Sequence, residues 1–274
     1  MPTGLGDEQL WISATNDNTG TSTAFNDQSG NGNNGTASGT LVVADTSEGG
    51  TYAYDFDGTN DYIDCGNDNS LSFVGGSGDT AMSITGWIKL DSYSNNNNSY
   101  GVAWLSRGTQ TYHASYSLNL IGGKVGLVRY PTGSNGSTYL VDETNSSQLP
   151  LSQWKHVAVT YSGCETTGCT EIFIDGSLVS STSSESSYTG MSVAYSNSVQ
   201  IGVSLRGTQY KRYTNGRQDD IRMFNRVLTQ AEITHLASSR GVEGPPPVGL
   251  GDEQMWLCPS LNDSADDISG NGNN

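Results

Sequence analysis

The stretch RQDDIRMFNRVLTQAEITHL, residues 217–236, decides the fold of this chain. From residue 219 to residue 224 the odd-numbered side chains point to one side of the backbone and the even-numbered ones to the other. This period of two predicts a β-strand. A short helix follows, because Thr229 can cap its start and Glu232 completes a capping box before the apolar Ile233 and Leu236. A late strand that runs into one short helix, in a chain with almost no other helical pattern, predicts a sheet that closes on itself.

Two adjacent carboxylates, Asp219 and Asp220, stand at the start of that strand. One interpretation is that both are solvated, as most carboxylates are. The other is that one of them binds a cation that joins this strand to a loop near the N-terminus. The local sequence leaves both interpretations open.

The composition limits both the fold and the partners. The chain has 274 residues, of which 35 are Gly and only 34% are hydrophobic, so it suits many short strands joined by polar turns. Its formal net charge of −16 argues against nucleic acid and membrane partners, and suits solubility or cation binding. No apolar run approaches the length of a membrane span, and residues 1–10 lack the regions of a signal peptide.

Four cysteines give a hint of the compartment. Cys164 and Cys169 lie in GCETTGC between two strand-like runs, VAVTY and EIFI, so a disulfide across a hairpin tip is expected. A metal site is disfavoured because no His or second cysteine pair stands nearby. A disulfide implies an oxidising, extracellular compartment. The sequence leaves open whether Cys65 pairs with Cys258.

Two motifs recur at long range. GLGDEQLW, residues 4–11, returns as GLGDEQMW at 249–256, and SGNGNN, residues 29–34, returns at 269–274. Offsets of this size make the repeat unit a whole domain. We therefore expect one domain over residues 1–243, a Pro-rich linker over 244–248, and the start of a second copy over 249–274, as in a tandem array. That last segment either lies loosely on the surface or adds as a strand to an exposed edge of another copy.

Short strand candidates follow one another at regular spacing, with almost no helices between them. Turn signals such as Asp57-Gly58, Gly122-Gly123 and Asp175-Gly176 separate them. This pattern predicts a two-sheet antiparallel sandwich. The predicted strands cover residues 39–43, 52–56, 61–64, 82–90, 100–106, 114–121, 124–129, 137–142, 154–161, 170–174, 177–181, 198–202 and 216–224.

The order of seven motifs resembles the laminin-G-like, concanavalin A-like jelly-roll domains. They are DQSGNGNNG (27–35), YDFDGTNDYIDCG (54–66), MSITGWIK (82–89), WKHVAVTY (154–161), IFIDGSLV (172–179), VQIG (199–202) and DDIRMFNRVLTQAEITHL (219–236). The resemblance implies an all-β, two-sheet antiparallel jelly-roll sandwich with one short C-terminal helix, used in extracellular recognition of carbohydrate or protein. It does not by itself give a ligand, because this fold hosts binding modules and enzymes alike.

The resemblance also implies a structural calcium ion between the first strand region and an Asp of the last strand, where Asp219 stands. Calcium takes six to eight oxygen ligands, and Gly-rich loops with Asp and Asn supply them. The alternative is that these residues form turns and satisfy their own backbone. Gln218 departs from the apolar residue usual in the family. The predicted calcium ligands are Asp27, Asn31, Asp57, Asn60 and Asp219.

Two enzyme classes are weighed against binding. Glycosidases need two facing carboxylates, and the glucanases of this fold carry them in a Glu-x-Asp run that this chain lacks. A polysaccharide lyase needs a Tyr or His base and a neutralising cation. Residues 112–113 (Tyr-His) and 210–213 (Tyr-Lys-Arg-Tyr) contain those types, but the companion motifs of the jelly-roll lyases are missing.

Aromatic and basic residues near the variable loops predict a glycan site, since sugars stack on rings and a carboxylated or sulfated glycan would pair with arginine. The alternative is that many of these rings are core, as Trp11, Trp87 and Trp154 are expected to be. We predict a non-catalytic extracellular module that binds a glycan. An adhesion or spacer repeat with a protein partner, and a lyase, are the alternatives. The predicted ligand-binding residues are Tyr100, Trp104, Arg107, Tyr112, His113, Arg129, Tyr210, Arg212 and Tyr213.

Overall fold

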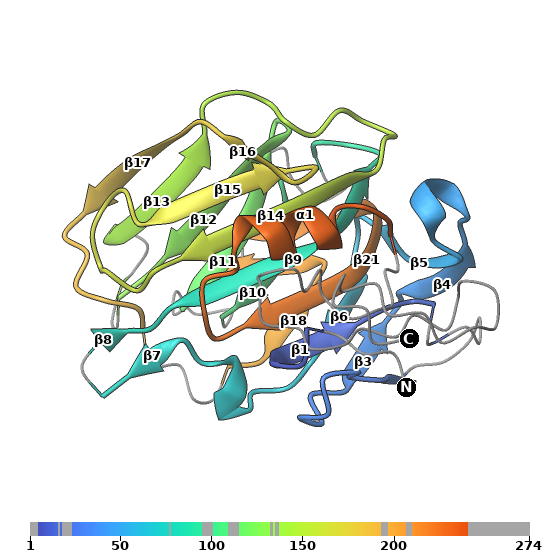
Figure 1. Cartoon of the computed structure of the whole chain (residues 1–274), viewed down its shortest axis with the longest axis horizontal. Helices are drawn as coiled ribbons and strands as arrows, with labels where there is room; N and C mark the ends of the chain where they lie inside the picture. The colour runs from blue at the N-terminus through green and yellow to red at the C-terminus, as the bar shows by residue number, and fades with distance from the viewer. Residues whose placement is uncertain are drawn as a thin grey trace, which may run out of the picture.

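Two antiparallel sheets pack face to face, and one helix, α1 (Gln230–Leu236), lies across the outer face of one of them (Figure 1). The computed structural model describes residues 5–240 apart from 16, 18–23, 77, 95–100, 109–114, 132–133, 135–136, 193–196 and 207–209. The predicted jelly-roll sandwich with one short C-terminal helix is confirmed. No helix among the described residues is long and apolar enough to cross a membrane.

The sheet beneath α1 has eight strands within the described residues. Strand β1 (Glu8–Ile12) pairs with the second half of β21 (Asn215–Phe224), and β5 (Tyr52–Asp57) pairs with the first half of β21. The remaining order is β16 (Ser177–Val179), β15 (Thr170–Ile174), β14 (Lys155–Tyr161), β9 (Met82–Leu90), β21 (Asn215–Phe224), β5 (Tyr52–Asp57) and β4 (Leu41–Ala44).

The second sheet has nine strands in the described chain. Its order is β17 (Ser181–Ser186), β13 (Tyr139–Thr144), β12 (Lys124–Arg129), β11 (Tyr116–Ile121), β10 (Val102–Arg107), β18 (Val199–Ile201), β6 (Tyr62–Asp64), β3 (Gly35–Ser38) and β2 (Ala24–Phe25). Short pieces complete the chain: the pairs β7 (Val74–Gly75) with β8 (Gly78–Asp79) and β19 (Val203–Arg206) with β20 (Tyr210–Tyr213), and the 3₁₀ turns η1 (Ser47–Gly49) and η2 (Asn69–Leu71).

The main core fills the space between the sheets, and a smaller apolar cluster lies under α1. In that cluster Ile233 and Leu236 of the helix pack against Ala158, Phe173 and Phe224 of the sheet. The capping box is present, because the Thr229 side chain accepts from the Glu232 amide and the Glu232 carboxylate accepts from the Thr229 amide. A cap of this kind stabilises a helix by about 1 kcal/mol.

Strand β21 departs from the simple alternation that its sequence predicts. Asp219 pairs with Trp87 but Arg222 pairs with Thr85, so β21 holds one extra residue opposite β9. This is a β-bulge, and Asp220 lies in it with a φ of 49°. The bulge lets both carboxylates turn into the protein, where Asp219 is 0% and Asp220 2% exposed. The interpretation of two solvated carboxylates is therefore wrong.

The hairpin between β14 and β15 carries the predicted disulfide, Cys164–Cys169, with its Cα atoms 6.1 Å apart. Cys65 is buried and free among the described cysteines. Residues 241–274 lie outside the described chain, so the predicted linker, the second copy and the pairing of Cys258 stay predictions.

Candidate functional site

The carboxylate predicted to bind a cation, Asp219, does lie beside a positive charge. Its Oδ1 accepts hydrogen bonds from the backbone amides of Ala14 (2.9 Å) and Asp220 (2.8 Å). Its Oδ2 accepts from Nη1 of Arg240 at 3.1 Å. The late strand is thus joined to the N-terminal segment, as predicted, and the cation beside it is a guanidinium of the chain itself.

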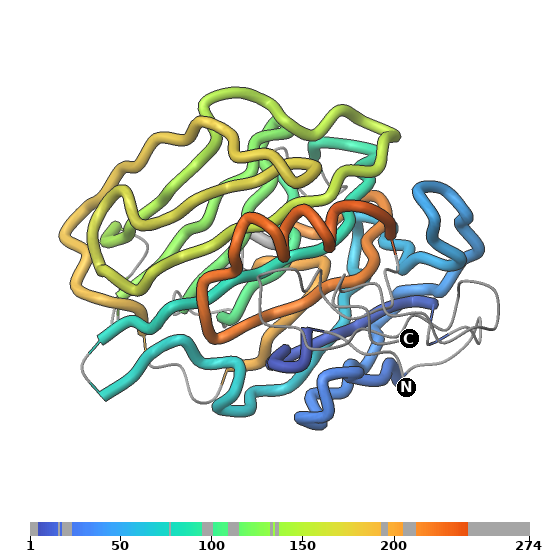
Figure 2. Tube along the Cα trace, viewed as in Figure 1, coloured from blue at the N-terminus to red at the C-terminus, as the bar shows by residue number. Residues whose placement is uncertain are grey.

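Arg240 is completely buried, and all three of its side-chain nitrogens donate hydrogen bonds. Besides Asp219, they reach the carbonyl oxygens of Ser47 and Tyr52, and both the carbonyl and the carboxylate of Asp45. The guanidinium also lies 4.2 Å from the ring centroid of Trp154. Arg240 therefore fastens the chain after α1 to η1, β5 and β21. Figure 2 shows α1 running toward η1 and β5.

The surroundings shift the pKa of both carboxylates. Burial, assisted by the charge of Asp220, raises the pKa of Asp219 to about 7. Burial would also raise the pKa of Asp45, but hydrogen bonds from Arg217 and Ser47 outweigh it and lower that pKa to about 2. The two carboxylates that accept hydrogen bonds from Arg240, those of Asp219 and Asp45, thus differ in how readily they take up a proton.

The other predicted calcium ligands have separate structural roles. Asp27 and Asn31 cover the outer edge of β1, where Asp27 Oδ1 accepts from the Trp11 amide (2.9 Å) and Asn31 Nδ2 donates to the Glu8 carbonyl (2.8 Å). Asp57 accepts from the Thr59 and Asn60 amides in the turn after β5. Within the described residues no three His, Cys, Asp or Glu side chains group as a metal site.

Calcium therefore does not fit at Asp219, where N–H groups already occupy the carboxylate. Calcium needs six to eight oxygen ligands, and Asp219 receives donors in the places where those ligands would stand. Calcium binding elsewhere in the chain stays a prediction.

Most of the described residues predicted to contact a ligand are core residues. Trp104 is 0%, Arg107 1% and Arg129 0% exposed, and Tyr213 is also buried. They cannot meet a ligand at the surface, because Trp104, Arg107 and Arg129 belong to strands whose side chains at these positions turn between the sheets. Arg212 of β20 is half-buried. Tyr100, Tyr112 and His113 lie outside the described residues, as does the Tyr210 side chain. The predicted core positions Trp11, Trp87 and Trp154 are confirmed.

The outer face of the nine-stranded sheet carries a polar row that the sequence analysis did not single out. Cross-strand pairing aligns one residue from each of eight strands, while their neighbours, such as Ile63, Leu118 and Leu127, enter the core. The row is polar from its first residue to Ser117. It consists of Thr36, Asp64, Gln200, Ser106, Ser117, Val128, Val141 and Ser184.

A hairpin of the chain itself covers the middle of this row. Ser106 Oγ donates to the Val203 carbonyl of β19 (2.9 Å), and Ser117 Oγ lies 3.0 Å from Ser204 Oγ. Ser106 and Ser117 are only 2% and 1% exposed. The β19–β20 hairpin therefore leaves the two ends of the polar row as the open parts of this face.

One of those ends forms a cleft of about 410 Å³ over the outer face of the paired strands β3 and β6, which we call the Tyr62 cleft. The Tyr62 ring is half-buried, and Asp64 beside it accepts from the Gly66 amide (2.9 Å) and from Gln200 Nε2 (3.2 Å). The cleft thus combines one ring with fixed polar groups. Its polar and aromatic lining is Asn34, Thr36, Ser38, Tyr62, Asp64 and the backbone at Gly66.

A second cleft, of about 460 Å³, lies beside α1 on the other sheet and is lined in part by Trp87, Lys89, Trp154 and Lys155. Its two indoles are only 4% and 7% exposed, so little ring surface is open for stacking. Lys155 Nζ already pairs with Asp175 at 2.6 Å. The Tyr62 cleft therefore offers a ligand more free recognition groups than this second cleft does.

Sequence reasoning missed Tyr62, Asp64 and Arg240 as important residues. The motif YIDCG, residues 62–66, alternates polar and apolar residues, and that alternation could have placed Tyr62 and Asp64 on an outer face. No comparable signal exists for Arg240, which stands alone after the helix.

Comparisons with known proteins agree with the fold. A family model described as the concanavalin A-like lectin/glucanases superfamily matches residues 57–234. No curated protein matches the chain. Among solved structures, the binding domain of Paraclostridial Mosquitocidal Protein 1 superposes with a TM-score of 0.58 at 15% identity, over 85% of this chain and 52% of that one.

Two further structures carry bound sugars. Domain 4 of AbnA, a GH43 extracellular arabinanase from Geobacillus stearothermophilus in complex with arabinotriose, gives a TM-score of 0.56 at 16% identity, over 84% of this chain and 98% of that one. The botulinum neurotoxin serotype D ligand binding domain in complex with N-acetylneuraminic acid gives 0.55 at 14%, over 85% and 51%. The chain spans about half the length of the toxin domains that it matches. At these identities the likeness shows the fold alone.

Proposed function

The chain belongs to the concanavalin A-like lectin/glucanase superfamily, and within it we propose that this protein is a non-catalytic extracellular module that binds a glycan. The observation that carries the proposal is the Tyr62 cleft on the outer face of the nine-stranded sheet. Sugar sites combine an aromatic face with a few fixed polar groups, and pockets for small ligands measure roughly 300–1,000 Å³. The cleft meets both conditions.

The groups in the cleft favour a neutral sugar over an acidic one. Asp64 contributes a carboxylate, and the whole chain carries a formal net charge of −16, so an anionic glycan would meet repulsion there. The buried Arg107 and Arg129 cannot offset that repulsion at the surface. Neutral oligosaccharides, of the kind named for the arabinanase domain, are therefore the first ligands to try.

The same lining supports binding without hydrolysis. A glycosidase places two carboxyl groups on either side of the scissile bond, about 5–10 Å apart. Asp64 is the one carboxylate among the described residues that line the Tyr62 cleft. The extracellular setting is supported by the Cys164–Cys169 disulfide, because disulfides persist in oxidising compartments.

A binding experiment tests the site. We expect the protein to bind a neutral oligosaccharide in a glycan array, and Tyr62→Ala to weaken that binding at least about tenfold in calorimetry, equivalent to about 1.4 kcal/mol. Asp64→Asn should leave a neutral ligand bound and change which hydroxyl pattern is preferred, because the amide both donates and accepts.

The matched control is Tyr139→Ala, which removes a half-buried tyrosine from β13, a strand near the opposite edge of the same sheet. It should leave the affinity unchanged. Equal affinities for the Tyr62→Ala variant and the unmodified protein would move the site away from this cleft. No binding of any oligosaccharide at millimolar concentration would overturn the proposed function.

A further inference from the structure

The repeated motifs at the two ends of the chain are not explained by glycan binding. We propose that the segment GLGDEQMWL, residues 249–257, can take the place of β1 on β21 of the same chain. We call the stretch of β21 that β1 covers, from Ile221 to Phe224, the β1 slot. The proposed partner of this surface is therefore a second strand of nearly the same sequence.

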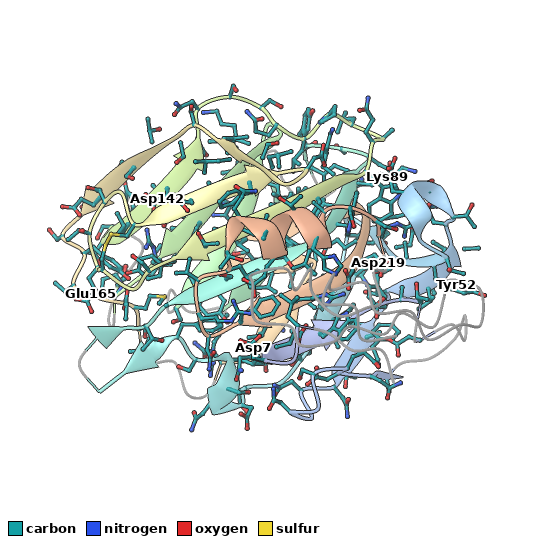
Figure 3. All side chains as sticks on the ribbon, viewed as in Figure 1. Asp7, Tyr52, Lys89, Asp142, Glu165 and Asp219 are labelled. Atoms are coloured by element: carbon teal, nitrogen blue, oxygen red, sulfur yellow. A yellow bond between two sulfur atoms is a disulfide. The ribbon has the colours of Figure 1, made fainter. Side chains whose placement is uncertain are left out.

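Three side chains, at residues 7, 8 and 11, fasten β1 to Arg222 in the slot and to the residues that flank it, Asp220 and Arg226. Asp7 pairs with Arg226, and Glu8 accepts from Nη1 of Arg222 at 3.3 Å. Trp11 Nε1 donates to Asp220 Oδ1 at 2.7 Å, and the Arg222 guanidinium lies 4.0 Å from the Trp11 ring centroid. Glu8 also accepts from the amides of residues 5 and 6, which orders the start of the strand. Figure 3 shows Asp7 beside the sheet that contains β21.

Each of these three side chains recurs at the other end of the chain. With an offset of 245, Asp252, Glu253 and Trp256 correspond to Asp7, Glu8 and Trp11. The two apolar residues of β1 that enter the core, Leu10 and Ile12, correspond to Met255 and Leu257, which are also apolar and of similar size. The second strand can therefore make the same ion pairs and fill the same space.

The second repeated motif belongs to the same structural unit. Residues 27–33, the edge loop, cover the free edge of β1: the Gln28 amide donates to the Trp11 carbonyl (2.7 Å), and Asn33 Nδ2 donates to the Gln9 carbonyl (2.8 Å). Asp27 and Asn31 complete this cover. With an offset of 240, Asp27, Asn31 and Asn33 return as residues 267, 271 and 273. The end of the chain thus carries both the strand and the groups that protect its edge.

The chain is long enough for the exchange. Arg240 is fixed beside Asp219, near one end of the slot, and the second strand must begin opposite Phe224, five residues further along β21. Those five residues span roughly 17 Å, and the twelve residues from 241 to 252 can span up to roughly 40 Å. The segment can therefore reach the slot of its own chain in the antiparallel direction.

One contact distinguishes the two strands. The Ala14 amide donates to Asp219 Oδ1 at 2.9 Å, whereas the corresponding residue of the second strand is Pro259, which has no N–H. The first strand is for this reason the favoured occupant, in agreement with the structure. The second strand takes the slot when the first is weakened.

A double-mutant cycle on the full chain tests whether residues 249–257 can replace β1 in the slot. Four proteins are compared by urea unfolding followed by far-ultraviolet circular dichroism: unmodified, Trp11→Ala, Trp256→Ala and the double variant. Trp256→Ala alone should leave the midpoint unchanged, because β1 fills the slot. Trp11→Ala should raise the unfolding equilibrium constant at least about tenfold more in the Trp256→Ala background than alone. Pro259→Ala should partly restore the Trp11→Ala variant.

Hydrogen exchange gives an independent readout, since amides of residues 250–257 should exchange more slowly in Trp11→Ala than in the unmodified chain. The matched control is Trp154→Ala, a buried tryptophan with no counterpart in 249–274, whose cost should not depend on Trp256. Additive effects of the two substitutions, or failure of Trp11→Ala to fold, would overturn the proposal. A coupling that grows with protein concentration would also overturn it, because the partner would then be a second copy.

Discussion

Arg240 and Arg129 are both fully buried, and each lies about 4 Å from an aromatic ring, 4.2 Å for Arg240 over Trp154 and 4.1 Å for Arg129 over Tyr161. Their acidic partners, Asp219 and Asp142, are at opposite ends of the sandwich (Figure 3). The two arginines differ in how completely the protein satisfies them. All three side-chain nitrogens of Arg240 donate, whereas Nε and Nη1 of Arg129 have no partner in the described part of the chain.

The acidic partners, Asp142 and Asp219, also differ in how well they would stay hydrogen-bonded if their arginine were removed. Asp142 also accepts from the hydroxyls of Thr170 (2.7 Å) and Ser183, so it keeps two donors if Arg129 is removed. Asp219 would also keep two donors without Arg240, but both are backbone amides on Oδ1, so its Oδ2 would have no donor among the described residues, whereas both oxygens of Asp142 keep one. Asp45 would lose a neighbouring charge. Because an unpaired buried donor costs free energy, the Arg129 end gains less from its ion pair than the Arg240 end does.

The largest expected effect comes from replacing each arginine by methionine, which keeps a long apolar side chain. Arg240→Met should lower the free energy of unfolding by about 3–5 kcal/mol, since it leaves the buried Asp219 without its cation and takes one of two close arginines from Asp45, which keeps Arg217. Arg129→Met should lower it by about 1 kcal/mol, because it also removes two unpartnered donors. Urea denaturation of both variants at one pH measures the difference.

Arg217→Met is the control, since Arg217 is a partly exposed arginine that pairs with Asp45 and Asp55. Exposed pairs contribute about 0–1 kcal/mol, so this variant should stay close to the unmodified protein. Equal losses for Arg240→Met and Arg129→Met would show that hydrogen-bond satisfaction does not separate the two ends.

A smaller effect, in the pH dependence of stability, is expected at the Arg240 end. The pKa of Asp219 is about 7 in the folded protein and near the usual 3.8 when unfolded, because burial disfavours the charge. The folded state therefore binds this proton more tightly, and the stabilisation that protonation provides is complete below pH 4 and lost as the pH rises to 7. Relative to Asp219→Asn, the unmodified protein should lose about 2–4 kcal/mol over that window.

The measurement is the difference in the free energy of unfolding between the unmodified protein and Asp219→Asn at each pH. Titrations that the two proteins share cancel in this difference. His156, whose pKa burial lowers to about 3, gives the opposite slope between pH 3 and 6.5, but it does so in both proteins. Ile233→Val, a change at a buried apolar position, should show a constant difference from pH 4 to 7. A constant difference for Asp219→Asn as well would mean that Asp219 stays ionised.

The sequence predicted the fold because its signals are local. The bounds of β9, β12 and β15 agree with their predicted residues, and the capping box of α1 and the Cys164–Cys169 disulfide are present. Strand β17 was missed beyond its first residue, because STSSES contains no apolar residue to set a period of two. It forms a strand at the edge of its sheet, where pairing with β13 replaces burial as the reason for extension.

The site was harder to predict because it depends on which face of a strand is outside. In VAWLSR of β10 all six residues are buried, and a register shift after Ala103 breaks the alternation, so Trp104 and Arg107 gave no sign of facing inward. The positive charge beside Asp219 was predicted, but as a metal ion. Its true source lies 21 residues away, after the helix, and only the tertiary fold brings Arg240 to it.

The smallest expected effect is a shift in thermal midpoint, and it tests whether Arg240 takes the place of a metal ion. Its guanidinium gathers five oxygens, the carbonyls of Ser47 and Tyr52, the carbonyl and a carboxylate oxygen of Asp45, and one of Asp219. Calcium takes six to eight oxygens, so these five with water could hold it once the side chain is gone.

We expect millimolar calcium to raise the thermal midpoint of Arg240→Ala by about 2–4 °C, equivalent to about 1 kcal/mol. Arg129→Ala should respond to calcium no more than the unmodified protein does. A chelator that lowers the midpoint of the unmodified protein would instead place a calcium ion elsewhere in the chain, and the guanidinium would then not be the only cation that this fold uses.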